Sequence, residues 1–242
     1  MSRSNVPDPD PRQLVSIVIP AYNEAPTIEH VLRRVAELDL RTEILVVDDG
    51  SADDTIRIVE RLNGDLPTVR LIAHERNQGK GAAVRTGIAA SRGDIVVIQD
   101  ADLEYDPHDL PKLLAPLLDC RADVVYGTRL RGGEPQRAHL FWHMAGNKFL
   151  SLLTNVLYNT TISDMEVGYK AFRGDLIRGI HLVSNDFRFE PEVTAKVLRV
   201  KGLRLYEIPI SYYCRSFEEG KKITWRDGFL AVGALLRFRV RK

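Results

Sequence analysis

The sequence predicts an α/β fold in which a mostly parallel sheet is flanked by helices. Short apolar runs of the kind found in strands buried on both faces recur along the 242-residue chain. Segments with apolar residues at helical spacing separate these runs. Such alternation is typical of a parallel sheet with right-handed, Rossmann-like connections. Ligands bind at the carboxyl ends of the strands in these sheets, so the residues that follow each strand are the candidates for a site.

Five strands are predicted, at 14–19, 43–47, 69–73, 95–99 and 123–127. Three helices between the first four strands are indicated by apolar residues three or four positions apart, at Ile28, Val31, Leu32, Val35 and Leu38, at Ile56, Val59 and Leu62, and at Ala82, Val84, Ile88 and Ala89. The first residues are rich in Pro and Asp and too polar to pack. We therefore expect a flexible tail over 1–13, one domain over 14–222 and a basic amphipathic helix over 223–242.

The composition is that of an ordinary soluble protein, with 44% hydrophobic and 28% charged residues. No run approaches the ~18 apolar residues of a membrane span, and the N-terminus lacks the apolar core of a signal peptide. The sequence therefore predicts a cytoplasmic protein. Residues 1–119 hold 13 Lys and Arg against 21 Asp and Glu, whereas residues 120–242 hold 21 against 12. The basic second half indicates an anionic partner.

An acidic stretch follows the fourth strand. If the chain stays extended there, Asp100 and Asp102 lie on one side, because side chains alternate along a strand, and Glu104 follows two residues later. Two neighbouring carboxylates need a cation to balance their charge, and oxygen ligands favour a divalent ion such as Mg²⁺ or Mn²⁺. With no Cys or His nearby, zinc is not expected. The alternative is that both Asp residues cap the next helix.

The other strand ends carry polar motifs. After the first strand the chain has Pro-Ala-Tyr-Asn-Glu over 20–24, where a dinucleotide-binding protein would need Gly-x-Gly-x-x-Gly. Asp49, after the second strand, has a carboxylate that suits hydrogen bonds from a base or ribose. After the third strand, Asn-Gln-Gly-Lys-Gly over 77–81 opens a helix whose free N–H groups, together with Lys80, suit an anion.

Together, these four motifs, in this order and at these strand ends, resemble glycosyltransferase family two, whose members use the GT-A nucleotide-sugar fold. The resemblance covers roughly residues 14–215. It implies a UDP- or GDP-sugar donor, a metal bound by Asp100, Asp102 and Glu104, and a catalytic role for Asp102. It also implies a set of donor-binding residues, namely Pro20, Tyr22, Glu24, Val47, Asp49, Lys80, Asp100 and Ala101.

The second half indicates the acceptor. Gly127-Thr128-Arg129 resembles the Gly-Ser-Arg of the polyprenyl-phosphate sugar synthases, the dolichyl-phosphate mannose synthase group, and implies that Arg129 grips a phosphate. Arg215 and Lys221 resemble the late phosphate contacts of this group. Residues 164–169, Asp-Met-Glu-Val-Gly-Tyr, resemble the Asp-x-x-x-Gly-Phe segment on the acceptor side, which makes Asp164 an orienting residue or a base. Because many relatives have small residues at Met-Glu, the role of Glu166 stays open.

Two segments have more apolar residues than one core-facing stripe requires. Residues 138–158 are the first, and residues 223–242 repeat the pattern with Trp225, Phe229, Leu235 and Phe238 among several Arg and Lys. We expect both to contact a membrane surface, the second as an in-plane anchor. The alternative is a core helix or an oligomer contact. Members of this group often carry C-terminal membrane spans, so a chain lacking them is expected to be peripheral, or to work with a separate integral membrane partner.

The predicted function is metal-dependent, inverting transfer of one sugar to polyprenyl phosphate at the inner face of the cell membrane. The product is a lipid-linked sugar donor for cell-envelope glycan or glycoconjugate synthesis. The main alternative is a family-two glycosyltransferase acting on a sugar hydroxyl. A nucleotidyltransferase and a non-catalytic nucleotide-sugar-binding module are weaker alternatives, and nucleic acid is not an expected partner.

Overall fold

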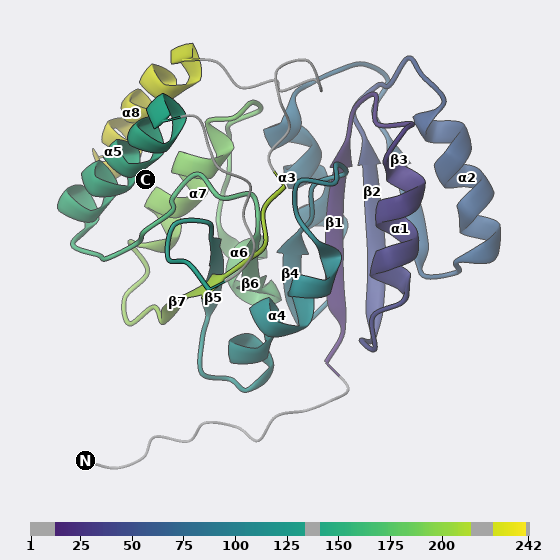
Figure 1. Cartoon of the computed structure of the whole chain (residues 1–242), viewed down its shortest axis with the longest axis horizontal. Helices are drawn as coiled ribbons and strands as arrows, with labels where there is room; N and C mark the ends of the chain where they lie inside the picture. Colours follow the sequence, from purple (N-terminus) through teal and green to yellow (C-terminus); the bar gives the residue numbers. More distant parts are fainter. Residues whose placement is uncertain (1–12, 134–140, 214–224, 241–242) are drawn as a thin grey trace.

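The computed structural model describes residues 13–133, 141–213 and 225–240. Within these ranges the chain forms a seven-stranded sheet in the order β3-β2-β1-β4-β6-β5-β7 (Figure 1). The strands are β1 (Val15–Ala21), β2 (Thr42–Asp48), β3 (Val69–Ala73), β4 (Ile95–Ile98), β5 (Val124–Thr128), β6 (Lys170–Arg173) and β7 (Leu205–Pro209). The helices are α1 (Ile28–Ala36), α2 (Thr55–Asp65), α3 (Lys80–Ala90), the 3-10 turn η1 (Pro107–Asp109), α4 (Leu110–Leu118), α5 (Phe141–Tyr158), α6 (Gly174–Gly179), α7 (Phe189–Val197) and α8 (Trp225–Val240).

The predicted fold class is confirmed, and each of the five predicted strands lies within two residues of its expected bounds. The central strands β1, β2 and β4 are parallel and covered on both faces, as their continuous apolar runs predict. Strands β6 and β7 were not predicted from the sequence. β6 is antiparallel to both β4 and β5, so the sheet is mixed. With only four residues, one of them a lysine, β6 carries too short a pattern to be recognised.

Helices cover both faces of the sheet. In Figure 1, α1 and α4 lie in front of the sheet and α3 lies behind it. Sheet order β3-β2-β1-β4 means that the chain reverses its direction of winding after β3 and returns past β1 to form β4. The carboxyl ends of β1 and β4 therefore diverge toward different loops, and a crevice forms at this switch point.

The chain does not remain extended after β4. The strand ends at Ile98, and residues 101–104 form a series of bends before Tyr105 makes an isolated bridge to Tyr212. This corrects the assumption that Asp100 and Asp102 share one face of a strand. Asp102 Oδ1 accepts the backbone N–H of Glu104 at 3.0 Å, a side-chain bond of the kind that stabilises a turn.

A helical group stands beside the β7 edge of the sheet. In Figure 1, α8 lies alongside α5 with α7 beneath it, and the Tyr158 hydroxyl on α5 donates to the Leu235 carbonyl on α8 at 2.8 Å. The assignment of Leu235 and Phe238 to the lipid side was wrong. Leu235 is 0% exposed, and Phe238 packs with Ala195 of α7, because the buried stripe of α8 faces α7.

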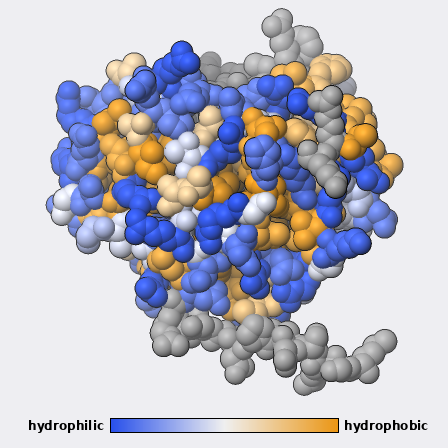
Figure 2. All heavy atoms as spheres, turned by 180° about the vertical axis from the view of Figure 1, so that it is seen from behind, coloured by the Kyte–Doolittle hydropathy of each residue, from blue (hydrophilic) through white to orange (hydrophobic). Residues whose placement is uncertain are grey.

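The outer side of the same two helices exposes an apolar surface, which we call the α5–α8 face. Its apolar members are Phe141, Trp142, Phe149, Leu152 and Val156 on α5, and Phe229, Leu230, Leu236 and Val240 on α8. Trp142 is 81% exposed. Seen from behind in Figure 2, apolar side chains gather at the upper right, where α5 and α8 lie. No helix in the described part of the chain is long and apolar enough to cross a membrane.

Candidate functional site

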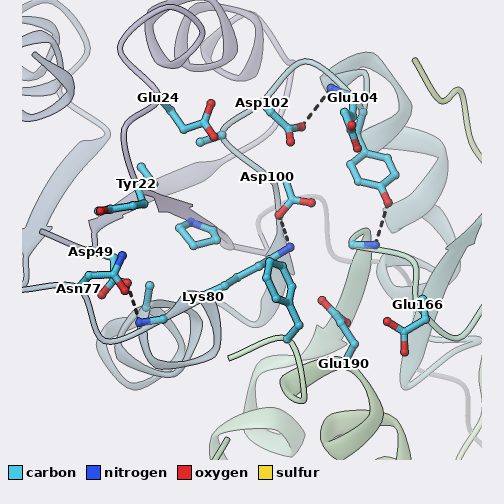
Figure 3. A pocket seen from close by; sticks show the side chains of 18 of the residues that line it. Tyr22, Glu24, Asp49, Asn77, Lys80, Asp100, Asp102, Glu104, Glu166 and Glu190 are labelled. Carbon is cyan, nitrogen blue, oxygen red and sulfur yellow. Dashed lines mark hydrogen bonds and ion pairs between the residues drawn. The ribbon is translucent and has the colours of Figure 1, made fainter. Parts of the chain in front are cut away.

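A cavity of about 340 Å³ opens at the carboxyl ends of β1, β2 and β4. Segments that follow six strands, β1 to β5 and β7, line it, together with the loop before β6 and the start of α7 (Figure 3). Its lining residues are Pro20, Ala21, Tyr22, Glu24, Asp49, Asn77, Gly79, Lys80, Ala83, Asp100, Ala101, Asp102, Glu104, Tyr105, Arg129, Glu166, Gly168, Phe187, Glu190 and Tyr212. The structure therefore brings most of the predicted site residues to one place.

Asp49 organises one end of the cavity. Its Oδ1 accepts the backbone N–H of Gln78 at 3.0 Å and meets His74 Nδ1 at 2.7 Å, while its Oδ2 accepts the N–H of Gly79 at 2.7 Å. The carboxylate thus fixes the loop that begins α3. The predicted contact from Asp49 to the nucleoside stays a prediction. Asp49 would make it in addition to the hydrogen bonds described here.

Lys80 is placed by a close approach of the chain at Gly79 and by an ion pair. Gly79 has a positive φ of 102°, and a Cβ there would lie 2.3 Å from the Asn185 carbonyl oxygen, so only glycine fits. The Lys80 ammonium then reaches Asp100 Oδ1 at 2.6 Å. Burial alone would lower the pKa of Lys80, but the carboxylates of Asp100 and Glu190 raise it above its ordinary value. Lys80 is therefore a fixed cation in the middle of the cavity.

Asp100 and Asp102 both line the cavity, whereas Glu104 Oε2 accepts the Tyr212 hydroxyl at 2.8 Å. A Cβ at Gly168 would lie 2.5 Å from Asp100 Oδ2, so a larger residue would displace this carboxylate. In the described part of the chain, no three His, Cys, Asp or Glu side chains are grouped closely enough to hold an ion by themselves. Mg²⁺ is usually bound by one or two carboxylates plus substrate phosphates. These residues therefore fit a divalent ion whose remaining ligands come from the substrate.

Arg129 and Asp164 form a buried bidentate ion pair. Arg129 Nε and Nη2 lie 2.7 Å from Asp164 Oδ2 and Oδ1, and the Arg129 backbone N–H lies 3.0 Å from Oδ2. Burial alone would raise the pKa of Asp164, but the Arg129 guanidinium holds that pKa below its ordinary range. A carboxylate held in this way is a poor base and a good orienting group. Arg129 lines the cavity with its guanidinium 5.0 Å from the centre of the Tyr212 ring.

Glu166, whose role the sequence left open, lies at the far end of the cavity. Its Oε1 is buried and has no hydrogen-bond partner among the described residues. Burial, followed by the neighbouring Glu190 carboxylate, raises the pKa of Glu166 to about 7, although Lys170 and Arg129 oppose the shift. The carboxyl group therefore changes charge near neutral pH.

Among the described residues, the predicted site residues Val47 and Asp164 do not line the cavity. Val47 is fully buried within β2. Arg215 and Lys221, the predicted acceptor-phosphate residues, lie outside the described residues. Their roles stay predictions.

Sequence reasoning missed several lining residues, above all Glu190, Tyr105 and Tyr212. Glu190 is the second residue of α7, and no sequence motif includes it. From the sequence alone, its carboxylate resembles an ordinary solvent-exposed acid in the first turn of a helix. Tyr105 and Tyr212 are brought together by the isolated bridge between segments more than a hundred residues apart, with ring centres 5.3 Å apart. No local pattern reports such a contact.

Residues 16–180 match the family model described as Glycosyl transferase family 2. An undecaprenyl-phosphate mannosyltransferase of Micrococcus luteus is 31% identical over 219 residues, covering 86% of this chain and 86% of that protein. A UDP-N-acetylglucosamine–dolichyl-phosphate N-acetylglucosaminyltransferase of Methanococcus voltae is 27% identical, covering 95% of this chain and 98% of that protein. A dolichol-phosphate mannosyltransferase of Pyrococcus furiosus is 28% identical over 86% of this chain, but this chain spans only 58% of it.

Among solved structures, a glucosyl-3-phosphoglycerate synthase from Mycobacterium tuberculosis, in complex with Mn²⁺, UDP and glucosyl-3-phosphoglycerate, superposes with a TM-score of 0.73. The match covers 93% of this chain and 80% of that chain at 23% identity. This likeness confirms the GT-A-like fold. The family match, together with the sequence identity to the Micrococcus enzyme, extends over most of the chain. The chain is thus a glycosyltransferase and belongs to Glycosyl transferase family 2.

Proposed function

We propose that this protein transfers a single sugar from a nucleoside diphosphate sugar to a polyprenyl phosphate, with inversion at the anomeric carbon. The observation that carries the proposal is the meeting of Asp100, Asp102 and Lys80 in the middle of the cavity. Carboxylates and a fixed cation at that position suit a diphosphate and a divalent ion. The named activities of the relatives, which pair a sugar with undecaprenyl or dolichyl phosphate, support the acceptor.

The donor would lie along the cavity with its nucleoside near Tyr22 and Asp49 and its diphosphate near Lys80. Asp100 and Asp102 would hold a divalent ion, Mg²⁺ or Mn²⁺, which when bound offsets the negative charge that develops on the departing diphosphate. Manganese in the mycobacterial synthase supports this ion. Lys80, which is held in place by Asp100, adds a fixed positive charge on the same side.

The acceptor needs no strong base. A phosphate monoester has a second pKa near ~6 and arrives mostly as a dianion, so one of its oxygens attacks the anomeric carbon directly. As that bond forms, the carbon–oxygen bond to the diphosphate breaks and its electron pair leaves with the nucleoside diphosphate. A single displacement of this kind inverts the anomeric carbon. Asp164 would orient Arg129 toward the acceptor, and positioning supplies much of the rate.

A sugar hydroxyl as acceptor is the second candidate, because it would need a base and Glu166 is present. A carboxyl group with a pKa of about 7 is suited to general base catalysis near neutral pH.

Incubation of the protein with polyprenyl phosphate and a panel of labelled UDP- and GDP-sugars tests the proposal. We expect label to enter a lipid from which mild acid releases the sugar, because a glycosyl phosphate is acid-labile. Reactions without protein, and reactions with polyprenol in place of its phosphate, are the controls. Label found only in acid-stable glycosides would favour the hydroxyl acceptor instead.

We also propose that the α5–α8 face binds the inner surface of the cell membrane. Its exposed aromatic and aliphatic side chains are accompanied by the exposed basic residues Lys148, Arg237 and Arg239. This combination is typical of interfacial helices. Each basic group near an anionic leaflet contributes ~1 kcal/mol, and salt screens this contribution.

The double variant Trp142→Ser with Phe229→Ser is expected to lose cosedimentation with anionic vesicles, and raised salt should partly release the wild type. Truncation of α8 is a poor test, because Leu235 and Phe238 belong to the core. Tyr206→Ser, which alters an exposed aromatic residue on β7, is the matched control and should bind vesicles like the wild type. Equal binding by the double variant would show that this face does not contact lipid.

A further inference from the structure

The end of the cavity opposite Tyr22 and Asp49 holds two carboxyl groups that have no role in the proposed transfer to a phosphate. Figure 3 shows Glu166 and Glu190 at this end, with Lys80 and Asp100 between them and the Tyr22 end. Glu166 comes from the loop before β6, and Glu190 is the second residue of α7. We call this pair the two-carboxyl end of the cavity.

Glu190 is held rigidly. Its Oε2 accepts a hydrogen bond from the ammonium group of Lys170. Lys170 is fully buried, and its ammonium group also donates to the Val167 carbonyl. The same ammonium lies 4.9 Å from the centre of the Tyr126 ring. Lys170 is therefore enclosed in the core and pairs with Glu190 there. An ion pair fixed in this way determines where the second oxygen of Glu190 is placed.

That second oxygen has no partner in the part of the chain that the structure describes. Glu190 is 5% exposed and lines the cavity, yet its Oε1 is buried without a hydrogen bond to any described residue, as is Oε1 of Glu166. An unpaired buried acceptor costs free energy, and few such groups occur in native proteins. Both oxygens therefore indicate a ligand that donates hydrogen bonds at this end of the cavity.

The parts of the donor differ in what they can offer. The diphosphate carries negative charge and only acceptor oxygens, so it would be repelled by Glu166 and Glu190. The nucleoside lies at the other end in the arrangement proposed above. Hydroxyl groups of the transferred sugar remain, and each of them donates one hydrogen bond.

We propose that Glu190 and Glu166 bind the hydroxyl groups of the transferred sugar, and that they select a neutral sugar over a sugar acid. This inference rests on the proposed function, because it assumes a nucleotide sugar in the cavity. The carboxylate of a uronic acid would lie beside the like-charged Glu190, and the lysine that pairs with Glu190, Lys170, is already enclosed by Glu190, Val167 and Tyr126. The carboxyl groups thus serve as binding residues that determine specificity.

Calorimetric titration in the presence of Mn²⁺ separates contacts to the sugar from contacts to the nucleotide. UDP, GDP, UDP-glucose and GDP-mannose are each titrated into the wild type and into Glu166→Gln. The variant is expected to bind the nucleotide sugar about 10- to 100-fold more weakly, the range that a charge-assisted hydrogen bond supports. Its affinity for the matching nucleoside diphosphate should not change.

Glu190→Gln alone would leave Lys170 buried without its counter-ion and could unfold the protein. The double variant Glu190→Gln with Lys170→Met removes both charges, a kind of exchange that proteins often tolerate. It should show the same selective loss as Glu166→Gln. The matched control is Glu192→Gln on the same helix, because Glu192 also pairs with a lysine, Lys196 at 2.7 Å, but lies outside the cavity. That control should bind both ligands like the wild type.

The outcomes distinguish this inference from the proposed function. Wild type that binds no nucleoside diphosphate or nucleotide sugar would overturn both. Two outcomes in which the wild type binds a nucleotide sugar would overturn the inference alone. In the first, the variants bind that nucleotide sugar as tightly as the wild type does. In the second, their affinity for the nucleoside diphosphate falls as much as their affinity for the nucleotide sugar. The same holds if UDP-glucuronate, or GDP-mannuronate for a GDP-specific enzyme, binds as tightly as the neutral sugar; we expect it to bind at least about 10-fold more weakly.

Discussion

Asp100→Asn and Asp102→Asn are each expected to reduce sugar transfer by at least ~10²-fold while the protein stays folded. Each change removes one negative charge from the pair that would hold the divalent ion against the diphosphate. Asp100→Asn also removes the ion pair to Lys80, whose Nζ lies 2.6 Å from Asp100 Oδ1. Transfer is measured with the donor that labels lipid, and circular dichroism checks the fold.

Asp106→Asn is the matched control for this pair. Asp106 follows Asp102 by four residues, pairs with Arg34 and His108, and does not line the cavity, so its variant should retain transfer. Calorimetric titration of the nucleoside diphosphate with and without Mn²⁺ gives a second readout that needs no turnover. We expect the metal to strengthen nucleotide binding in the wild type and in Asp106→Asn, but not in either cavity variant. Full activity in EDTA would show that no metal is required.

Arg129→Ala is expected to lower the free energy of unfolding by about 3–5 kcal/mol. Asp164 is 0% exposed and accepts three hydrogen bonds from Arg129, so the variant leaves a buried carboxylate without its counter-ion. Urea denaturation at pH 7 measures the loss. The control is Arg121→Ala, which breaks an exposed pair with Asp119 and should cost ~0–1 kcal/mol.

The loss of stability in Arg129→Ala should depend on pH. Its direction follows from the pKa of Asp164 in the wild type and in the variant. In the wild type, Arg129 keeps the pKa of Asp164 low, so the pair stabilises the fold at neutral pH and this contribution disappears as acid protonates the carboxylate. Without Arg129, burial raises that pKa above its unfolded value. The variant is then least stable at neutral pH and recovers relative to the wild type as pH falls. A difference that stays constant from pH 4 to pH 8 would contradict this account.

The same ion pair changes how the acceptor contact of Arg129 has to be tested. A loss of transfer in Arg129→Ala could come from unfolding, because the guanidinium already supports Asp164. Arg129→Lys retains the charge and loses the planar bidentate geometry. If Arg129 grips the acceptor phosphate, this variant should raise KM for polyprenyl phosphate while donor binding stays unchanged.

The sequence by itself determined the strands up to β5 and the residues that follow them. Ile95 to Ile98 form a buried strand because a continuous apolar run is stable only between two covered faces. The acidic and basic motifs come directly after such strands, and parallel strands end at one edge of the sheet, so the chain order alone placed Asp49, Lys80 and Asp100 together. Both steps depend on local patterns and on one rule of topology.

Only the tertiary structure decided which partner each charged group has. Arg129 and Asp164 are 35 residues apart, and Lys170 and Glu190 are 20 residues apart, so neither pair leaves a periodic signal in the sequence. Packing also decided the orientation of α8: Leu235 and Phe238 are buried, and Phe238 packs with Ala195 of α7, which a count of apolar residues does not reveal. The spacing of apolar residues specifies which side of a helix or strand is apolar. Which other helix or strand covers that side depends on the tertiary structure.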